Sequence, residues 1–102
     1  MQMTIDSVNG DLDDATHEYI ERRLRFVFTR FSPRIKRISL SVKSEDRPWG
    51  GCDSWCKVSV KLIPAEGIEI EVHAEDIRSS VAQAVDRAGR AVARKVNQQP
   101  RS

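Results

Sequence analysis

The chain has 102 residues, of which 31% are charged and 39% are hydrophobic, as in a soluble globular protein rather than a disordered one. This length provides one modest hydrophobic core, so we expect a single domain over residues 1–97 and a disordered tail over residues 98–102. The sequence shows no apolar run that could span a bilayer, no leader pattern and only two cysteines, so we expect a cytoplasmic protein with reduced thiols and no membrane partner.

The formal net charge is only +2, but the charges are segregated along the chain. Residues 1–21 hold six acids and no Lys or Arg, whereas residues 22–44 hold eight basic residues and no acid. Residues 45–76 hold eight acids against three basic residues, and residues 77–102 hold six basic residues against Asp86 alone. Alternating blocks of this kind give the molecule a directional field, which matters more for binding than the net charge.

The chain opens with a strand pattern over residues 2–8 and a turn over residues 9–11. A helical period then runs from about Asp13 to Phe31, and Ser32-Pro33 is expected to end it because the residue before a proline disfavours helix. The apolar face of this helix holds Ile20, Leu24, Val27, Phe28 and Phe31. The candidates for its N-cap are Asp11, Asp13 and Asp14.

Three strands are predicted next, because apolar and polar residues alternate over residues 38–43, 56–62 and 68–73. Residues 46–54 contain Pro48, Gly50 and Gly51 and are predicted to form a loop, and a tight connection is expected at residues 64–67. On the outer faces of the last two strands we expect a ladder of opposite charges, worth about 0.2–1 kcal/mol per pair. Its members are Lys57, Lys61, Glu69 and Glu71.

A second amphipathic helix is predicted from Glu75 to Val96, with acids at the positive end of its dipole. Its apolar face holds Ile77, Val81, Val85, Ala88, Val92 and Val96. Arg87, Arg90 and Arg94 recur at i, i+3 and i+7 on the opposite face, and no acid follows Asp86. Planar cations one turn apart, with no partner in their own segment, suit a row of phosphates.

The predicted order is β-α-β-β-β-α, which indicates an α+β fold. The economical arrangement is a two-layer sandwich, in which a four-stranded, mostly antiparallel sheet has both helices packed on one face. This architecture is like that of a double-stranded-RNA-binding domain. The other sheet face, rich in Ser, Lys and Glu, can stay in water.

Helices on one sheet face would place their basic faces on one surface, suited to the backbone of RNA or DNA. The competing interpretation is an ordinary solvated charged face. The RNA-binding residues predicted on the two helices are Arg22, Arg23, Arg25, Arg30, Arg87, Arg90, Arg94 and Lys95. Tyr19 and Phe26 lie beside these arginines and could stack on unpaired bases, although packing against the neighbouring helix is the commoner role of aromatic side chains.

The sequence gives no support for an enzyme or a metal site. Cys52 and Cys56 are three residues apart, unlike the zinc-knuckle spacing, and Cys56 fits the inward set of its strand. Only His17 and His73 could complete a metal site, and neither shows a pairing signal. No nucleophile–base arrangement and no glycine-rich phosphate loop is recognisable. We therefore expect no catalytic residue, no cofactor and no small-molecule substrate.

The chain resembles the ribosome hibernation promoting factor and ribosome-associated inhibitor family, also known as sigma-factor modulation proteins. The resemblance rests on the element order and on the following segments: Met1-Gln2-Met3-Thr4-Ile5, Asp46-Arg47-Pro48-Trp49-Gly50-Gly51, Cys56-Lys57-Val58 and Glu75-Asp76-Ile77. It implies a short-form protein that binds ribosomal RNA of the small subunit in the messenger and transfer RNA channel. Such a protein holds ribosomes inactive under stress.

The resemblance also assigns positions on the helices. Arg87, Arg90 and Arg94 fall where the family carries Lys or Arg on its last helix, and Arg23 falls on a basic position of the first helix. Phe26 occupies a further position that is basic in the family, which is a departure from the pattern. Two alternatives remain open at this stage. One is a protein-interaction or homodimerising module without RNA binding, and the other is a small hydrolase-like enzyme.

Overall fold

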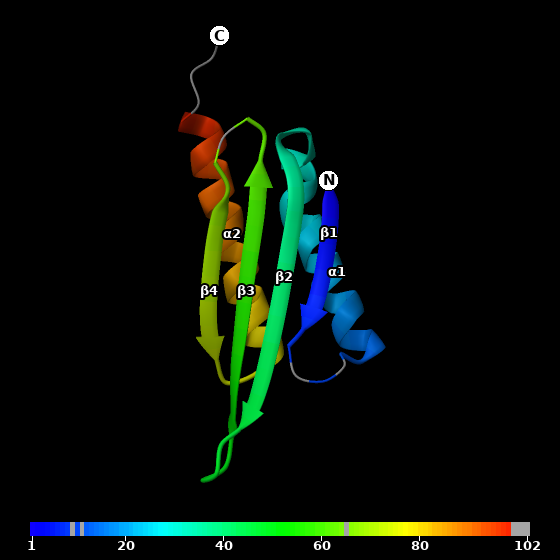
Figure 1. Ribbon diagram of the computed structural model, residues 1–102, viewed down its shortest axis with the longest axis vertical. Helices are drawn as coiled ribbons and strands as arrows, with labels where there is room; N and C mark the ends of the chain where they lie inside the picture. Colours follow the sequence, from blue (N-terminus) through cyan, green and yellow to red (C-terminus); the bar gives the residue numbers. More distant parts are fainter. Residues whose placement is uncertain (9, 11, 65, 99–102) are drawn as a thin grey trace.

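The computed structural model describes residues 1–8, 10, 12–64 and 66–98 of the chain. Its elements follow the predicted order, with a short 3-10 helix added after the first α-helix (Figure 1). They are β1 (Gln2–Ser7), α1 (Asp14–Phe28), η1 (Thr29–Arg34), β2 (Ile35–Asp46), β3 (Cys52–Leu62), β4 (Ile68–Ala74) and α2 (Ile77–Gln98). The α+β fold class is confirmed.

The four strands form one sheet in the order β1-β2-β3-β4. β1 pairs with β2 in parallel, whereas β2–β3 and β3–β4 are antiparallel. The parallel pair follows from α1, which carries the chain back to the end of the sheet where β1 began. Ile5 pairs with Leu40, and Leu40 pairs with Val58, so the apolar residues of neighbouring strands share one face.

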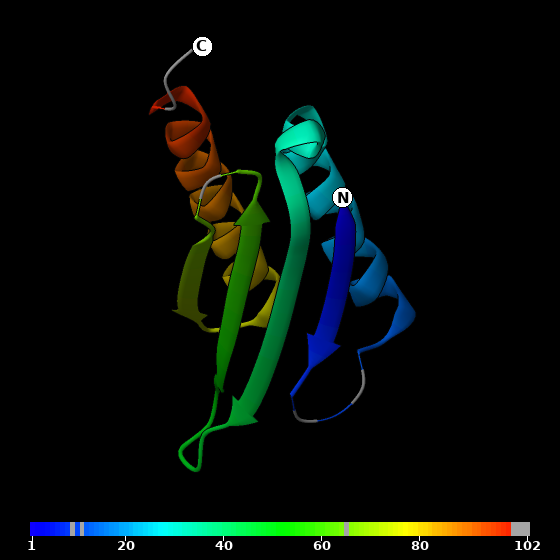
Figure 2. The same cartoon turned by 45° about the horizontal axis from the view of Figure 1, so that its top comes forward.

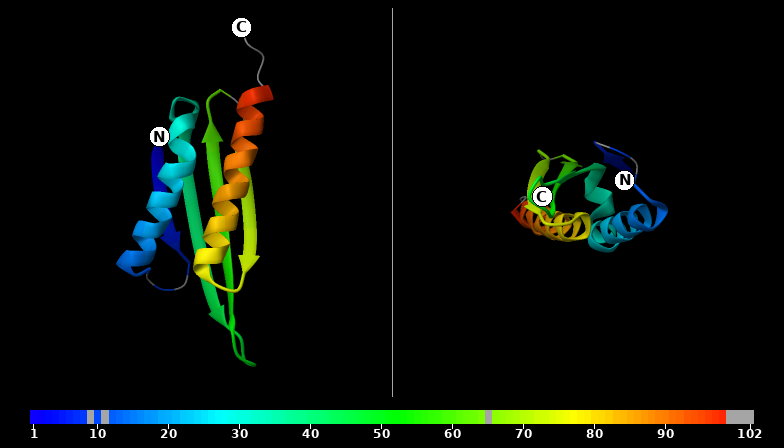
Figure 3. Two further views of the ribbon diagram at one scale, coloured as in Figure 1. Left: turned by 180° about the vertical axis from the view of Figure 1, so that it is seen from behind. Right: turned by 90° about the horizontal axis from the view of Figure 1, so that it is seen from below.

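Both helices lie side by side on that apolar face and leave the other face uncovered (Figure 3). The core fills the space between the helices and the sheet. Its helical side chains are Ile20, Leu24, Phe28, Val81, Ala84, Val85, Ala88 and Val92. Its strand side chains are Ile35, Ile38, Leu40, Val42, Cys56, Val58, Val60, Leu62 and Val72. The two-layer arrangement with both helices on one face is thus confirmed.

The first helix ends earlier than predicted. The α-helix stops at Phe28, and the next six residues, with Pro33 among them, form the 3-10 helix η1. Proline removes a backbone donor and restricts the residue before it, so the chain tightens before it enters β2. At the other end Asp13 is the N-cap, because the Thr16 backbone N–H donates to its carboxylate over 2.7 Å.

β2 and β3 are longer than predicted and extend as a hairpin beyond the ends of β1 and β4 (Figure 2). The expected loop over residues 46–54 is only five residues long, since Asp46 already pairs with Cys52. Gly50 and Gly51 have φ angles of 98° and 86°, which L side chains rarely adopt. Trp49, at the tip of this turn, is 80% exposed.

The predicted charge ladder forms only in part. Lys57 makes an ion pair with Glu69 across β3 and β4, with 3.1 Å between nitrogen and oxygen. Lys61 lies beyond the last β3–β4 pair, which is Val60–Ile68, and its neighbour on β2 is Arg37. The expected pairing of Lys61 is therefore wrong, because the register sets Glu71 opposite Lys57 and Glu69 opposite Ser59.

The second helix is shifted by about two residues from its predicted span and runs from Ile77 to Gln98. The Asp76 side chain accepts hydrogen bonds from the Ser79 backbone N–H at 2.7 Å and from the Ser79 hydroxyl at 3.2 Å. Residue 98, expected in the tail, is helical. Residues 99–102, the remainder of the expected tail, lie outside the described residues.

Candidate nucleic-acid interface

The helices approach each other closely at one point, Gly89 of α2. A Cβ atom at Gly89 would lie 2.5 Å from Val27 Cγ1 on α1, too close for a real contact. Glycine inside a helix costs roughly 1 kcal/mol relative to alanine. The absence of a side chain at this position is what allows the two backbones to lie so near each other, and it explains why a glycine stands inside this helix.

The arginine row of α2 faces solvent. Arg87, Arg90 and Arg94 are all exposed, and among the described residues none of them has a hydrogen bond or ion pair. Lys95 follows Arg94 by about 100° around the helix and is half-buried, so it lies on the flank of the row. The row therefore presents three guanidinium groups whose donors are available to a ligand.

The arginines of α1 and the neighbouring Arg30 of η1 are divided between solvent and structural contacts. Arg22 is exposed, and Arg30 is exposed with its guanidinium carbon 4.6 Å from the centre of the Phe31 ring. Arg23, with 30% of its side chain exposed, donates to Asp86 of α2 over 2.8 Å. This pair joins the helices and neutralises Asp86, the single acid that the sequence places in the last basic block.

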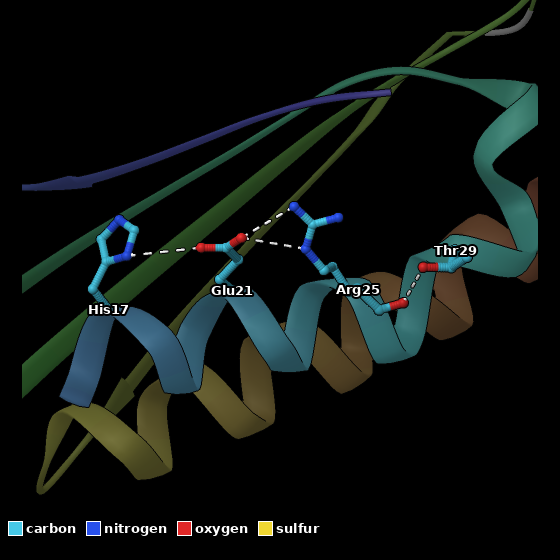
Figure 4. Close-up of polar contacts among 4 residues, drawn as sticks. All are labelled: His17, Glu21, Arg25 and Thr29. Carbon is cyan, nitrogen blue, oxygen red and sulfur yellow. Dashed lines mark hydrogen bonds and ion pairs between the residues drawn. The ribbon is translucent and has the colours of Figure 1, made fainter. Parts of the chain in front are cut away.

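Arg25 lies on the other flank of α1, away from α2. Its guanidinium donates to Glu21 over 3.0 Å, and Glu21 also lies 4.0 Å from the His17 ring (Figure 4). The three side chains border a hollow next to the first strand, together with Met1, Met3 and Ile5. The structure therefore does not bring Arg25 together with the arginines of α2.

The two aromatic residues on the flank of α1 behave differently. Tyr19 is half-buried against the core, with the Arg78 guanidinium 4.7 Å from its ring centre. Packing is therefore its role, as the commoner interpretation holds. Phe26 is 81% exposed and does not pack in this way. It borders a groove of about 430 Å³ between the helices, whose other lining residues are Val27, Arg30, Asp86, Gly89, Arg90 and Ala93.

The cysteines show no sign of a reactive site. Cys56 is fully buried, and burial raises the pKa of its thiol to about 12. Its assignment to the core is confirmed. Cys52 is half-buried, and its sulfur lies 2.9 Å from the Ser44 hydroxyl. Over the described ranges of the chain, no cluster of three or more His, Cys, Asp or Glu side chains could hold a metal ion.

The sequence of the chain matches the model of a known protein family. Residues 3–99 match the family model described as Sigma 54 modulation protein / S30EA ribosomal protein. The chain belongs to this family. The resemblance identified from the sequence is thereby confirmed, and the description is that of a ribosomal protein family rather than an enzyme family.

Solved structures agree with the fold of this S30EA family member. A ribosomal subunit interface protein from Coxiella burnetii superposes with a TM-score of 0.77 at 16% identity, over 96% of this chain and 100% of that one. The N-terminal domain of Protein Y from Thermus thermophilus gives a TM-score of 0.63 at 20% identity, over 93% and 99% of the two chains. No curated protein sequence matches the chain. Among the described residues, no helix is long and apolar enough to cross a membrane.

Proposed function

We propose that this protein binds the ribosome through the outer surface of its two helices and inhibits translation. The partner is ribosomal RNA of the small subunit, in the channel that messenger and transfer RNA use, and the outcome is ribosome hibernation under stress in the cytoplasm. Family membership supports ribosome association, and the name of the Coxiella relative, a ribosomal subunit interface protein, is consistent with it.

One observation carries the RNA-binding part of the proposal. Five arginines lie on the solvent side of the helical layer, and within the described chain none of them is paired with a carboxylate. They are Arg22, Arg30, Arg87, Arg90 and Arg94. Such groups bind phosphate through charge-assisted hydrogen bonds. The net charge of +2 understates the positive charge of this surface, because Asp86, the acid that lies between Arg30 and Arg90, is already paired with Arg23.

Two of the remaining predicted RNA-binding residues, Arg23 and Arg25, have other roles in this proposal. Arg23 holds Asp86 and so fixes α1 against α2, and Arg25 is held by Glu21 on the far flank. Lys95 extends the row of α2 at its side. Because the contacting groups project from rigid helices, affinity comes from the shape and charge of the RNA backbone with little reading of base identity.

The decisive experiment removes the α2 row. In R87A/R90A/R94A the substituted side chains are exposed, so the circular dichroism spectrum and the urea midpoint should stay close to those of the wild type. Co-sedimentation with ribosomes should weaken. The slope of log K against log salt should fall by roughly two units, at about 0.7–0.9 for each phosphate that the variant no longer neutralises.

A matched control separates local effects from overall charge. R25A/R37A/K61A also removes three positive charges, but from the flank of α1 and the open sheet face. This variant should keep the wild-type salt slope. Ribosome binding by R87A/R90A/R94A that equals the wild type, or an equal weakening in both triple variants, would contradict the proposal.

A further inference from the structure

The most exposed large apolar side chain of the described residues lies beside the inter-helix groove. Phe26 projects from α1 with 81% of its surface in water. A single exposed aromatic residue is ordinary on a protein surface. Phe26 differs from an isolated surface aromatic residue because it borders a groove. The groove has an apolar floor and two guanidinium groups beside the ring.

The floor of the groove is made of small or apolar groups. Val27 of α1 and Gly89 and Ala93 of α2 line it, and the Val27 side chain packs directly against the backbone of Gly89. The volume, about 430 Å³, lies in the range of small-ligand sites. The Phe26 ring thus borders a space in which a flat group can lie against it.

The charge of the groove is positive. Arg30 of η1 and Arg90 of α2 line it, and the one acid among its lining residues, Asp86, is already neutralised by Arg23 at 2.8 Å. The Arg30 guanidinium rests on the Phe31 ring at 4.6 Å, which orders the side chain and leaves its N–H donors available. An anionic group attached to a flat ring matches both parts of the groove.

We propose that this groove binds one unpaired nucleotide of an RNA strand, with its base stacked on Phe26 and its phosphates held by Arg30 and Arg90. The proposal rests on the proposed function and adds to it a contact with a base. Stacking on an aromatic ring requires a base that is splayed out, because the bases of a duplex are already stacked on each other. The groove therefore selects single-stranded or bulged RNA over a continuous helix.

The test uses the full chain and a uridine oligonucleotide with one central 2-aminopurine, whose fluorescence is quenched when it stacks. The variants are F26L, which keeps an apolar side chain without a ring, and F26W, which keeps the ring. Stacking on an aromatic residue typically changes affinity by about 5-fold or more. We expect F26L to bind the oligonucleotide at least about 5-fold more weakly without quenching, and F26W to retain both signals.

A duplex RNA of the same length and the variant R87A complete the design. F26L should bind the duplex as the wild type does, whereas R87A should weaken single-stranded and duplex binding to a similar degree. If the wild type sediments with ribosomes and F26L shows unchanged quenching and affinity, the stacking proposal is overturned and the proposed function stands. If the wild type binds neither ribosomes nor RNA, both are overturned.

Discussion

Replacing Gly89 with alanine tests whether the close approach of the two helices is as tight as the structure shows. Two effects oppose each other. Alanine gains about 1 kcal/mol over glycine inside a helix, but its Cβ would lie 2.5 Å from Val27 Cγ1. The valine cannot easily turn aside, since one χ1 rotamer is strongly preferred in a helix. Overpacking of this kind costs roughly 1–3 kcal/mol.

The expected result is that G89A lowers the free energy of unfolding by about 0–2 kcal/mol. Each 1 kcal/mol corresponds to a fall in Tm of about 4–8 °C for a domain of this size. Urea unfolding followed by tryptophan fluorescence and circular dichroism measures the change. V27A provides the matched background, because the nearest remaining atom, Val27 Cβ, would be 4.0 Å from the new methyl group, an ordinary contact.

In the V27A background the clash is absent and only the helix propensity remains. G89A should then stabilise the protein by up to about 1 kcal/mol, so the effect of one substitution changes sign with the residue opposite it. The difference between the two backgrounds is the coupling energy of the pair. A stabilising effect of G89A in the wild-type protein would refute the reasoning, as would identical effects in both backgrounds.

Two further predictions concern titratable groups. Hydrogen bonds from the Thr16 side chain and backbone lower the pKa of Asp13 below its ordinary value of 3.8. The charged cap therefore adds stability at neutral pH. The stability advantage of the wild type over D13N should be constant above about pH 5 and shrink as the pH falls below about 4. Urea midpoints measured for both proteins across this pH range would show the change. The buried Cys56 thiol, with its pKa raised to about 12, should resist iodoacetamide at pH 8 while Cys52 reacts. Mass spectrometry should then find one adduct on the native protein and two in denaturant, and rapid native labelling at Cys56 would contradict this.

The fold was predictable wherever burial leaves a period in the sequence. Ile38, Leu40 and Val42 alternate because their strand has one buried face, and the same argument locates both helices. The outer part of the β2–β3 hairpin was missed because Ser44, Glu45 and Asp46 are polar, so only backbone pairing marks the strand there. Pairing of backbones leaves no pattern in the side chains.

The candidate site was less predictable than the fold. The spacing of Arg87, Arg90 and Arg94 placed them on the outer face of α2, which depends only on the helical period. The pairing of Arg23 with Asp86 joins residues far apart in the chain and depends on how closely the helices pack. No local pattern contains that information, and the exposure of Phe26 beside the groove depends on it too.

The parallel pairing of β1 with β2 has a consequence for the order of assembly. β2, β3 and β4 are joined by short turns and can pair with one another directly. Pairing of β1 with β2 instead sets Gln2 opposite Arg37 and encloses the whole of α1 in the loop between them. Closing so large a loop costs entropy before any favourable interaction compensates for it, so docking of the first strand and its helix should be a late event on the folding pathway. A nascent chain would then acquire its two-helix surface only as it reaches the native state. On the proposed function, partly folded molecules would therefore have little affinity for the ribosome.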